Sequence, residues 1–298
     1  MKEPKDVLSD LPLSGVRRLV PLPELVGRHV GQVVDLPGRG QTYVTDIGRR
    51  EGPTLVMLHA LACTAMLTWY PVLEELSKRY RVVLLDQRWH GQGIRAAGSS
   101  LDDAASDVVA VADALGIDQF VPVGYSMGSL VAQLTWRRHP SRVAGLVLCA
   151  TSSSFKRNSR DRLAMRLTEM AVSTTRRRAE HLATLAPHPY LPAEETYRWV
   201  LGEFRSTSPL ALGQSVSAIS RFNSSEWIGD VDVPTSVVIT GRDRIIPPGR
   251  QRWIANQIYG STSYEIPAGH ASCVLNAEKF KPALLAACAS VAGRLAPA

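Results

Sequence analysis

The sequence predicts an α/β protein with a mostly parallel sheet and helices on both faces. Two observations carry this prediction. Short, continuously apolar runs recur along the chain, as expected of strands that are buried on both sides. Helical stretches lie between these runs, and an alternation of strand and helix is typical of parallel sheets, because a crossover helix returns the chain to the next strand.

The expected elements follow in chain order, beginning with residues 1–30, which have proline and charge punctuation and are expected to be an N-terminal extension. Pro37-Gly38-Arg39-Gly40 predicts a hairpin, and therefore an antiparallel entry to the sheet. With the two hairpin strands the sheet is of the eight-stranded type, and the expected strands are Gln32–Leu36, Thr42–Ile47, Thr54–Leu58, Arg81–Leu85, Phe120–Val123, Val143–Cys149, Ser236–Thr240 and Ser263–Ile266.

Helices are expected over 65–79, 101–115, 127–139, 249–257 and 276–294. In the second of these, apolar residues recur at steps of four, three, four and three, which places them on one helix face: Leu101, Ala105, Val108, Ala112 and Leu115.

The alternation stops between Ser152 and Ile228, where no strand-like run occurs. Leu163, Leu167 and Met170 recur at helical spacing, and a second helical stretch is expected near Glu194 to Phe204. We therefore expect residues 152–228 to form a helical lid, with 31–151 and 229–298 as the two parts of the core domain.

The composition is that of a globular protein, with 45% hydrophobic and 20% charged residues. The net charge is +7, and residues 152–228 carry eleven basic against seven acidic side chains, which predicts either a solvated basic surface or attraction of an acidic substrate or membrane surface. No recognition motif accompanies the arginines, so no nucleic-acid partner is expected.

The four cysteines form no CxxC pair, and no metal-ligand pattern accompanies them, so we expect reduced thiols and no metal or cofactor. The charged N-terminus, with its prolines, gives no secretory segment, and no window reaches the apolar length of a membrane span. We expect a cytoplasmic protein. The sequence carries no signal for an oligomeric state.

The pentapeptide GYSMG at 124–128 stands between an expected strand and an expected helix. A tight, serine-capped turn is one interpretation. The other is a nucleophile: Gly124 and Gly128 would permit a sharp strand-to-helix turn that exposes Ser126 at the carboxyl edge of the sheet.

A serine nucleophile needs a base and a group that orients the base. Asp243 and His270 each come directly after an expected strand, later in the chain than Ser126, which is the order that the nucleophile-elbow architecture requires. Asp230 and Asp232 precede their strand and are expected at its opposite end. His59 and His90 lie at the edge that carries Ser126 but do not follow it in the chain.

The oxyanion of an acyl-transfer reaction needs two backbone donors. We expect one from the N–H of Met127, at a helix N-terminus, and the other from Leu61, in the loop His59–Ala62.

With these residues in place, the chain resembles the α/β-hydrolase fold superfamily over about residues 32 to 294. The matching segments are HALA at 59–62, DQRWHGQG at 86–93, GYSMG at 124–128, GRDRIIPP at 241–248 and AGH at 268–270. The resemblance implies the same nucleophile, acid and base, and a helical lid. Serine in place of aspartate at 126 argues against the epoxide-hydrolase and dehalogenase branches.

Two positions depart from the family pattern. Ala60 replaces the usual glycine of the oxyanion loop, which reduces backbone freedom there. Trp89 stands where the loop after the fourth strand usually has glycine, and it either narrows the pocket or packs in the core.

These observations predict a serine hydrolase that cleaves a carboxylic ester or related acyl bond of a small molecule. Lactones, thioesters and C–C bonds next to a ketone are alternatives for the same triad. A non-catalytic binding protein on this fold is an alternative of another class.

Overall fold

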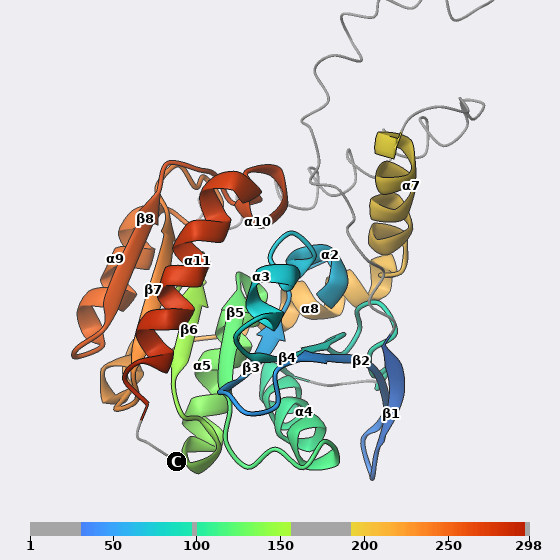
Figure 1. The fold of residues 1–298 in the computed structure, drawn as a ribbon, viewed down its shortest axis with the longest axis horizontal. Coiled ribbons are helices and arrows are strands. Elements are labelled where there is room, and N and C mark those ends of the chain that lie inside the picture. The colour runs from blue at the N-terminus through green and yellow to red at the C-terminus, as the bar shows by residue number, and fades with distance from the viewer. Residues whose placement is uncertain (1–30, 97–99, 156–191, 296–298) are drawn as a thin grey trace, which may run out of the picture.

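The computed structural model describes residues 31–96, 100–155 and 192–295. These residues form one eight-stranded sheet and the helices that cover it (Figure 1). The strand order is β1-β2-β4-β3-β5-β6-β7-β8. The strands are β1 (Gln32–Leu36), β2 (Gly40–Gly48), β3 (Thr54–Leu58), β4 (Arg81–Leu85), β5 (Val121–Tyr125), β6 (Leu146–Cys149), β7 (Thr235–Thr240) and β8 (Thr262–Ile266).

The expected hairpin is present, since β1 pairs antiparallel with β2. Strand β2 pairs antiparallel with β4, and every later pairing in the sheet is parallel. The described helices are α2 (Ala65–Trp69), α3 (Leu73–Ser77), α4 (Leu101–Ala114), α5 (Met127–Arg138), α7 (Pro192–Arg205), α8 (Pro209–Arg221), α9 (Pro248–Gln257), α10 (Ser272–Leu275) and α11 (Ala277–Ala292). The predicted fold class is confirmed.

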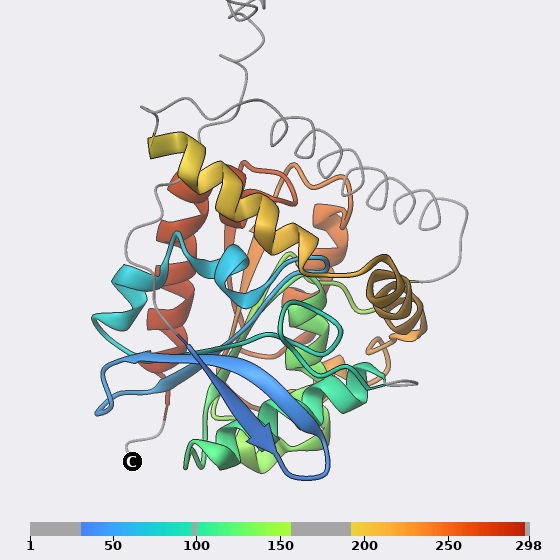
Figure 2. The same cartoon turned by 90° about the vertical axis from the view of Figure 1, so that its right-hand side faces the viewer.

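Helices cover both faces of the sheet, with α11 on one side and α4 and α5 on the other (Figure 2). Successive side chains of a strand point to opposite faces, and β3 shows the result: Val56 and Leu58 pack with α4 and α5, whereas Leu55 and Met57 pack with α2, α3 and α11. Both faces are apolar, which explains why the central strands have continuous rather than alternating hydrophobicity.

Two expected helices are shorter or divided. The helix expected over 65–79 is split into α2 and α3, because Pro71 cannot continue the backbone hydrogen bonds of a helix interior. The helix expected over 276–294 is slightly shorter in the structure, where it is α11, and the short helix α10 ends just before it.

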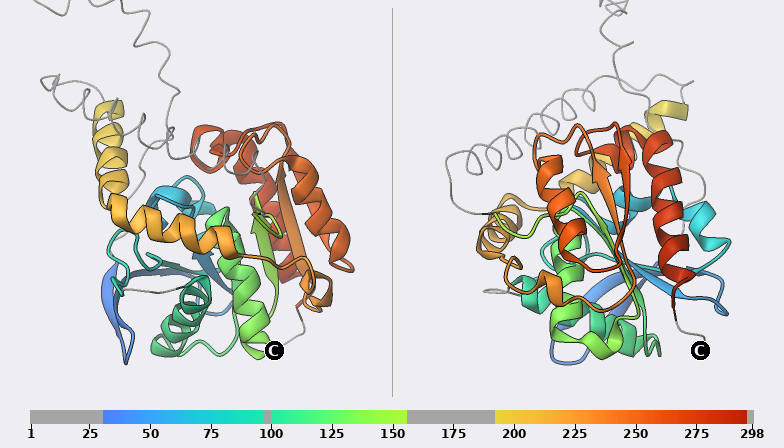
Figure 3. Two further views of the ribbon diagram at one scale, coloured as in Figure 1. Left: turned by 180° about the vertical axis from the view of Figure 1, so that it is seen from behind. Right: turned by 90° about the vertical axis from the view of Figure 1, so that its left-hand side faces the viewer.

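Helices α7 and α8 occupy part of the segment in which the alternation stops, and the helix expected near Glu194 to Phe204 is α7. In the rear view α8 crosses in front of α5 (Figure 3, left panel). The helical spacing of Leu163, Leu167 and Met170, and the extension over 1–30, lie outside the described residues.

Two further predictions concern the cysteines and membrane spans. All four cysteines are free, as predicted, and Cys149, Cys273 and Cys288 are buried. Within the described ranges, no helix combines the length and the apolar character needed to cross a membrane.

Candidate active site

Ser126 stands at the turn from β5 to α5, at the carboxyl edge of the sheet. Its φ is 52° and its ψ is −114°, a conformation that residues with a Cβ rarely adopt. The turn is held because the N–H of Ser126 donates to the carbonyl of Cys149, 2.9 Å away on the neighbouring strand. Backbone strain of this kind is typical of functional sites.

The glycines on either side of Ser126 are required by close backbone contacts. A Cβ on Gly124 would lie 2.5 Å from Cα of Ser129, and a Cβ on Gly128 would lie 2.5 Å from the carbonyl carbon of Leu58. Helix α5 can therefore approach β3 and β5 only with glycine at both positions. The spacing of GYSMG thus has a steric cause in this chain.

The structure brings the three predicted side chains together. His270 Nε2 is 2.9 Å from Ser126 Oγ, and His270 Nδ1 is 2.7 Å from Asp243 Oδ2. The loop that carries His270 is fixed by Tyr125, whose hydroxyl donates to the carbonyl of His270 at 2.6 Å. An imidazole bonded on both sides in this way can take a proton from the serine while the carboxylate orients the ring.

Asp243 is buried and receives several hydrogen bonds. Its Oδ1 accepts from the backbone N–H groups of Ile245 and Ile246, at 2.8 and 2.9 Å, and its Oδ2 accepts from the hydroxyl of Thr240 at 2.7 Å. Burial alone would raise the pKa of Asp243, but the hydrogen bond from His270 and these donors together hold it below its ordinary value. The carboxylate therefore stays ionised beside the imidazole.

Gln251 supports this carboxylate from α9, and no sequence motif marks it. Its amide nitrogen donates to the Thr240 hydroxyl at 2.8 Å and to the carbonyl of Ile246 at 2.7 Å. Its amide oxygen accepts from the N–H of Thr240 at 2.9 Å. The two rival carboxylates lie elsewhere: Asp232 accepts from Trp136, and Asp230 pairs with Arg137.

The two expected oxyanion donors lie next to Ser126 and in the loop after β3. Met127 is the first residue of α5, and Leu61 follows Ala60 in the turn that leads to α2. The N–H of Ala60 is bound to the hydroxyl of Thr68 at 3.3 Å, whereas none of the hydrogen bonds found among the described residues uses the N–H of Leu61 or Met127. Both groups are thus available to bind an oxygen atom.

His59 and Gln87 hold the loop that contains Leu61. His59 Nε2 accepts from the N–H of Gln87 at 2.9 Å, and the Gln87 amide donates to the carbonyl of His59 at 2.8 Å. Burial lowers the pKa of His59 to about 4, so the ring is neutral and acts as a structural acceptor. His90 is also fully buried, and burial lowers its pKa to about 3. None of the hydrogen bonds found among the described residues joins either histidine to Ser126.

Ala60 and Trp89, the two departures from the family pattern, behave differently. Ala60 does not have positive φ, so glycine's extra freedom is not needed there. Trp89 has a φ of 70°, in the left-handed region that favours glycine. The residue is 3% exposed and its Nε1 donates to the carbonyl of Ala96 at 3.1 Å, so Trp89 packs in the core.

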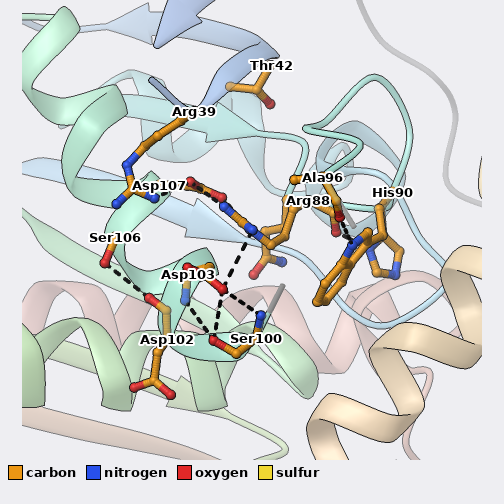
Figure 4. A network of polar contacts seen from close by, with 12 residues as sticks. Arg39, Thr42, Arg88, His90, Ala96, Ser100, Asp102, Asp103, Ser106 and Asp107 are labelled. Carbon is orange, nitrogen blue, oxygen red and sulfur yellow. Dashed lines mark hydrogen bonds and ion pairs between the residues drawn. The ribbon is translucent and has the colours of Figure 1, made fainter. Parts of the chain in front are cut away.

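A buried ion pair holds the loop that follows β4 and contains Trp89 (Figure 4). The guanidinium of Arg88 donates to both carboxylate oxygens of Asp107, at 2.6 and 2.7 Å, and Arg39 contacts the same carboxylate at 2.9 Å. The bidentate geometry ties the loop after β4 to helix α4. Gln87, which bonds His59, directly precedes Arg88 in the chain.

Helix α7 contacts the start of α2, close to the oxyanion loop. The hydroxyl of Thr64, which caps α2, donates to the carboxylate of Glu203. Trp199 and Val200 of α7 pack in an apolar cluster that also contains Leu67. Glu203 and Thr64 are 139 residues apart in the chain, and no sequence motif links them.

Comparisons with known proteins agree with the fold. A family model described as "alpha/beta hydrolase fold" matches residues 53–277. The chain belongs to the α/β-hydrolase family. The prediction that it is an enzyme of this family is confirmed as well.

Two curated relatives of this α/β-hydrolase are bacterial enzymes. The pimeloyl-[acyl-carrier protein] methyl ester esterase of Chromobacterium violaceum is 29% identical over 253 residues, which cover 81% of this chain and 96% of the relative. The pyrrolizixenacetamide deacetylase of Xenorhabdus hominickii is 26% identical over 238 residues, covering 77% and 88%.

Among solved structures, the enol-lactonase of Burkholderia xenovorans LB400 superposes with a TM-score of 0.72 at 22% identity, covering 87% of this chain and 100% of that one. At this level of identity the superposition establishes the shared fold.

Proposed function

We propose that this α/β-hydrolase cleaves a carboxylic ester or a related acyl bond through an acyl-enzyme. The observation that carries the proposal is the chain of two hydrogen bonds, 2.9 Å from Ser126 Oγ to His270 Nε2 and 2.7 Å from His270 Nδ1 to Asp243 Oδ2. This is the order of nucleophile, base and orienting acid that acyl transfer needs.

In the acylation step, Ser126 Oγ attacks the carbonyl carbon of the ester as His270 Nε2 takes the hydroxyl proton. The carbonyl oxygen becomes an oxyanion, which accepts hydrogen bonds from the N–H groups of Met127 and Leu61. When the tetrahedral intermediate collapses, the bond to the leaving oxygen breaks, and His270 gives its proton to the departing alcohol. The ionised Asp243 stabilises the imidazolium throughout.

In the deacylation step, water attacks the acyl-enzyme, and His270 removes a proton from that water. A second oxyanion forms in the same place, and its collapse releases the carboxylic acid and returns the proton to Ser126 Oγ. The triad thus ends in its starting state.

The choice of an ester is supported by the relative from Chromobacterium violaceum, whose name states a methyl ester esterase. The name of the relative from Xenorhabdus hominickii states a deacetylase, which also breaks an acyl bond. The same triad could open a lactone or cleave a thioester or a C–C bond, and these substrates belong in the same screen.

We further propose that residues 152–228 form a lid over the core made by 31–151 and 229–298. The support is the contact of α7 with α2, where Glu203 binds Thr64 beside the oxyanion loop. A lid at this place would close over the acyl group and exclude water from the oxyanion.

The proposed function is tested with the Ser126→Ala variant and short nitrophenyl esters. Removing the nucleophile should lower kcat by about 10⁴-fold or more. Ser77→Ala is the matched control, because Ser77 lies on α3 and bonds only its own helix, through the carbonyl of Glu74. Turnover that persists in Ser126→Ala would exclude this serine as the nucleophile.

A further inference from the structure

A cavity lies at the end of α5 that is opposite to Ser126. It has a volume of about 450 Å³, is open to solvent on one side, and is lined by the start of α4, the end of α5 and the end of α8. Ser126 precedes α5 and Arg137 is near its last residue, so at about 1.5 Å per residue the two lie roughly 17 Å apart along the helix. The volume falls within the range of small-molecule sites, about 300–1,000 Å³.

The charged side chains that line this cavity are unbalanced. Among its described lining residues are three arginines, Arg137, Arg138 and Arg221, against one carboxylate, that of Asp102. Asp230 does not line the cavity but lies 3.3 Å from Arg137, so with it included the local excess is one positive charge. Such a surface attracts an anion and raises its local concentration.

The arginines also keep hydrogen-bond donors for a ligand. Arg138 Nε donates to Asp102 at 2.7 Å, and Arg221 Nη1 donates to the hydroxyl of Ser217 at 2.7 Å. Arg137 Nη1 is 3.3 Å from the carboxylate of Asp230. A guanidinium has five N–H donors, and each of these contacts uses one. The geometry of a guanidinium suits the paired oxygens of phosphate or carboxylate.

Aromatic rings form an apolar wall in the same cavity. Trp227 stacks on Trp136 with ring centroids 6.4 Å apart, and Phe222 meets Trp227 edge-on at 6.5 Å. The Arg137 guanidinium lies over the Trp227 ring, 5.5 Å from its centroid. Trp227 and Phe222 both line the cavity, so a bound molecule would meet cationic and apolar groups at once.

We propose that this cavity binds a small phosphate monoester that carries an apolar or aromatic group. A phosphate monoester has a charge of about −1.5 to −2 at pH 7, so it would be attracted by the net positive charge of the three arginines and their two carboxylate partners. Its oxygens would bind Arg137 and Arg221, and its apolar part would contact Trp227. Because α8 supplies one wall and α4 and α5 supply the others, the ligand would tie α8 to the core.

The test uses phenyl phosphate as the probe and isothermal titration calorimetry of the Ser126→Ala protein, in which the nucleophile is absent. We expect saturable binding, and we expect the double variant Arg137→Gln/Arg221→Gln to bind at least about tenfold more weakly, since charge-assisted hydrogen bonds are lost. The matched control is Arg252→Gln, because Arg252 is an equally accessible arginine on α9 that pairs with Glu265. This control should bind as the parent does.

Three results would overturn the proposal. One is the absence of saturable binding to the parent protein, and another is equal affinity in the double variant when its melting temperature matches that of the parent. The third is inorganic phosphate binding as tightly as phenyl phosphate, which would remove the role of the aromatic wall. Hydrogen exchange gives an independent readout, because the probe should slow exchange in α8 of the parent and leave it unchanged in the double variant.

Discussion

Strained backbone conformations gather at one edge of the sheet. Among the described residues, four other than glycine have positive φ: Ala62, Trp89, Ser126 and Ala150. They follow β3, β4, β5 and β6 respectively, so all four lie in loops at the carboxyl ends of parallel strands. Each left-handed residue costs about 1–2 kcal/mol. Strain of this kind persists only where the surrounding packing determines the conformation, and Ser126 stands among these loops.

The buried histidines predict how stability depends on pH. In the unfolded chain both titrate near 6.5, whereas in the folded protein burial lowers the pKa of His59 to about 4 and that of His90 to about 3. At a pH between the unfolded and folded pKa of each histidine, the unfolded state binds more protons than the folded state. Stability therefore falls as the pH drops from about 6.5 toward 4.

The His90→Leu variant tests this dependence. Between pH 7 and pH 5 one such histidine should cost the folded state about 2 kcal/mol, at about 1.4 kcal/mol per pH unit below its unfolded pKa. The loss of stability over this interval should therefore be about 2 kcal/mol smaller in His90→Leu than in the parent. Urea unfolding at both pH values measures it, and because each protein is compared with itself, packing changes cancel. Equal losses in both proteins would contradict the expectation.

At the scale of elements, the approach of α5 to β3 and β5 depends on the two glycines around Ser126. Gly128→Ala should destabilise the fold by about 2–4 kcal/mol, because the new Cβ would overlap the backbone of Leu58. It should also reduce kcat, since the turn that aims Ser126 would shift. Thermal unfolding and ester turnover measure the two effects.

Gly213→Ala is the matched control for Gly128→Ala. Gly213 lies inside α8 with open space where its Cβ would stand. Alanine is the better helix former by about 1 kcal/mol, so this substitution should stabilise α8. If both substitutions had the same effect on stability, steric contact at Gly128 would not be the cause.

The strands, and the meeting of Ser126, Asp243 and His270, could be predicted from the sequence because their signals are local. Apolar runs indicated the strands, and their positions just after strand ends indicated Asp243 and His270. The division of one expected helix into α2 and α3 also had a local signal, Pro71, which the periodicity alone did not reveal.

The supporting contacts could not be predicted, because they join residues without a shared motif. Gln251 reaches Thr240 and Asp243 from a separate helix. Glu203 binds Thr64 across 139 positions of the chain. The packing of Trp89 depends on core neighbours that only the folded chain brings together. A single sequence carries no information about such distances.

At the scale of the whole molecule, the net charge of +7 predicts a preference for anionic substrates. The electrostatic attraction between the protein and an anionic substrate should be screened by salt, because the Debye length falls from about 30 Å at 0.01 M to about 8 Å at 0.15 M. Over this range the KM of an anionic ester should rise severalfold, while the KM of a neutral ester of the same acyl group stays constant. If both values responded equally to salt, the charge would have no role in substrate binding.

The role of Ser126 as nucleophile is tested most directly by a fluorophosphonate probe with peptide mapping of the adduct. The folded protein should form one covalent adduct, at the hydroxyl of Ser126, and the reaction should be lost after denaturation because activation by His270 requires the folded site. His270→Ala should slow labelling strongly while leaving the serine in place. A folded protein that resists the probe, or an adduct on a different residue, would contradict the assignment of Ser126.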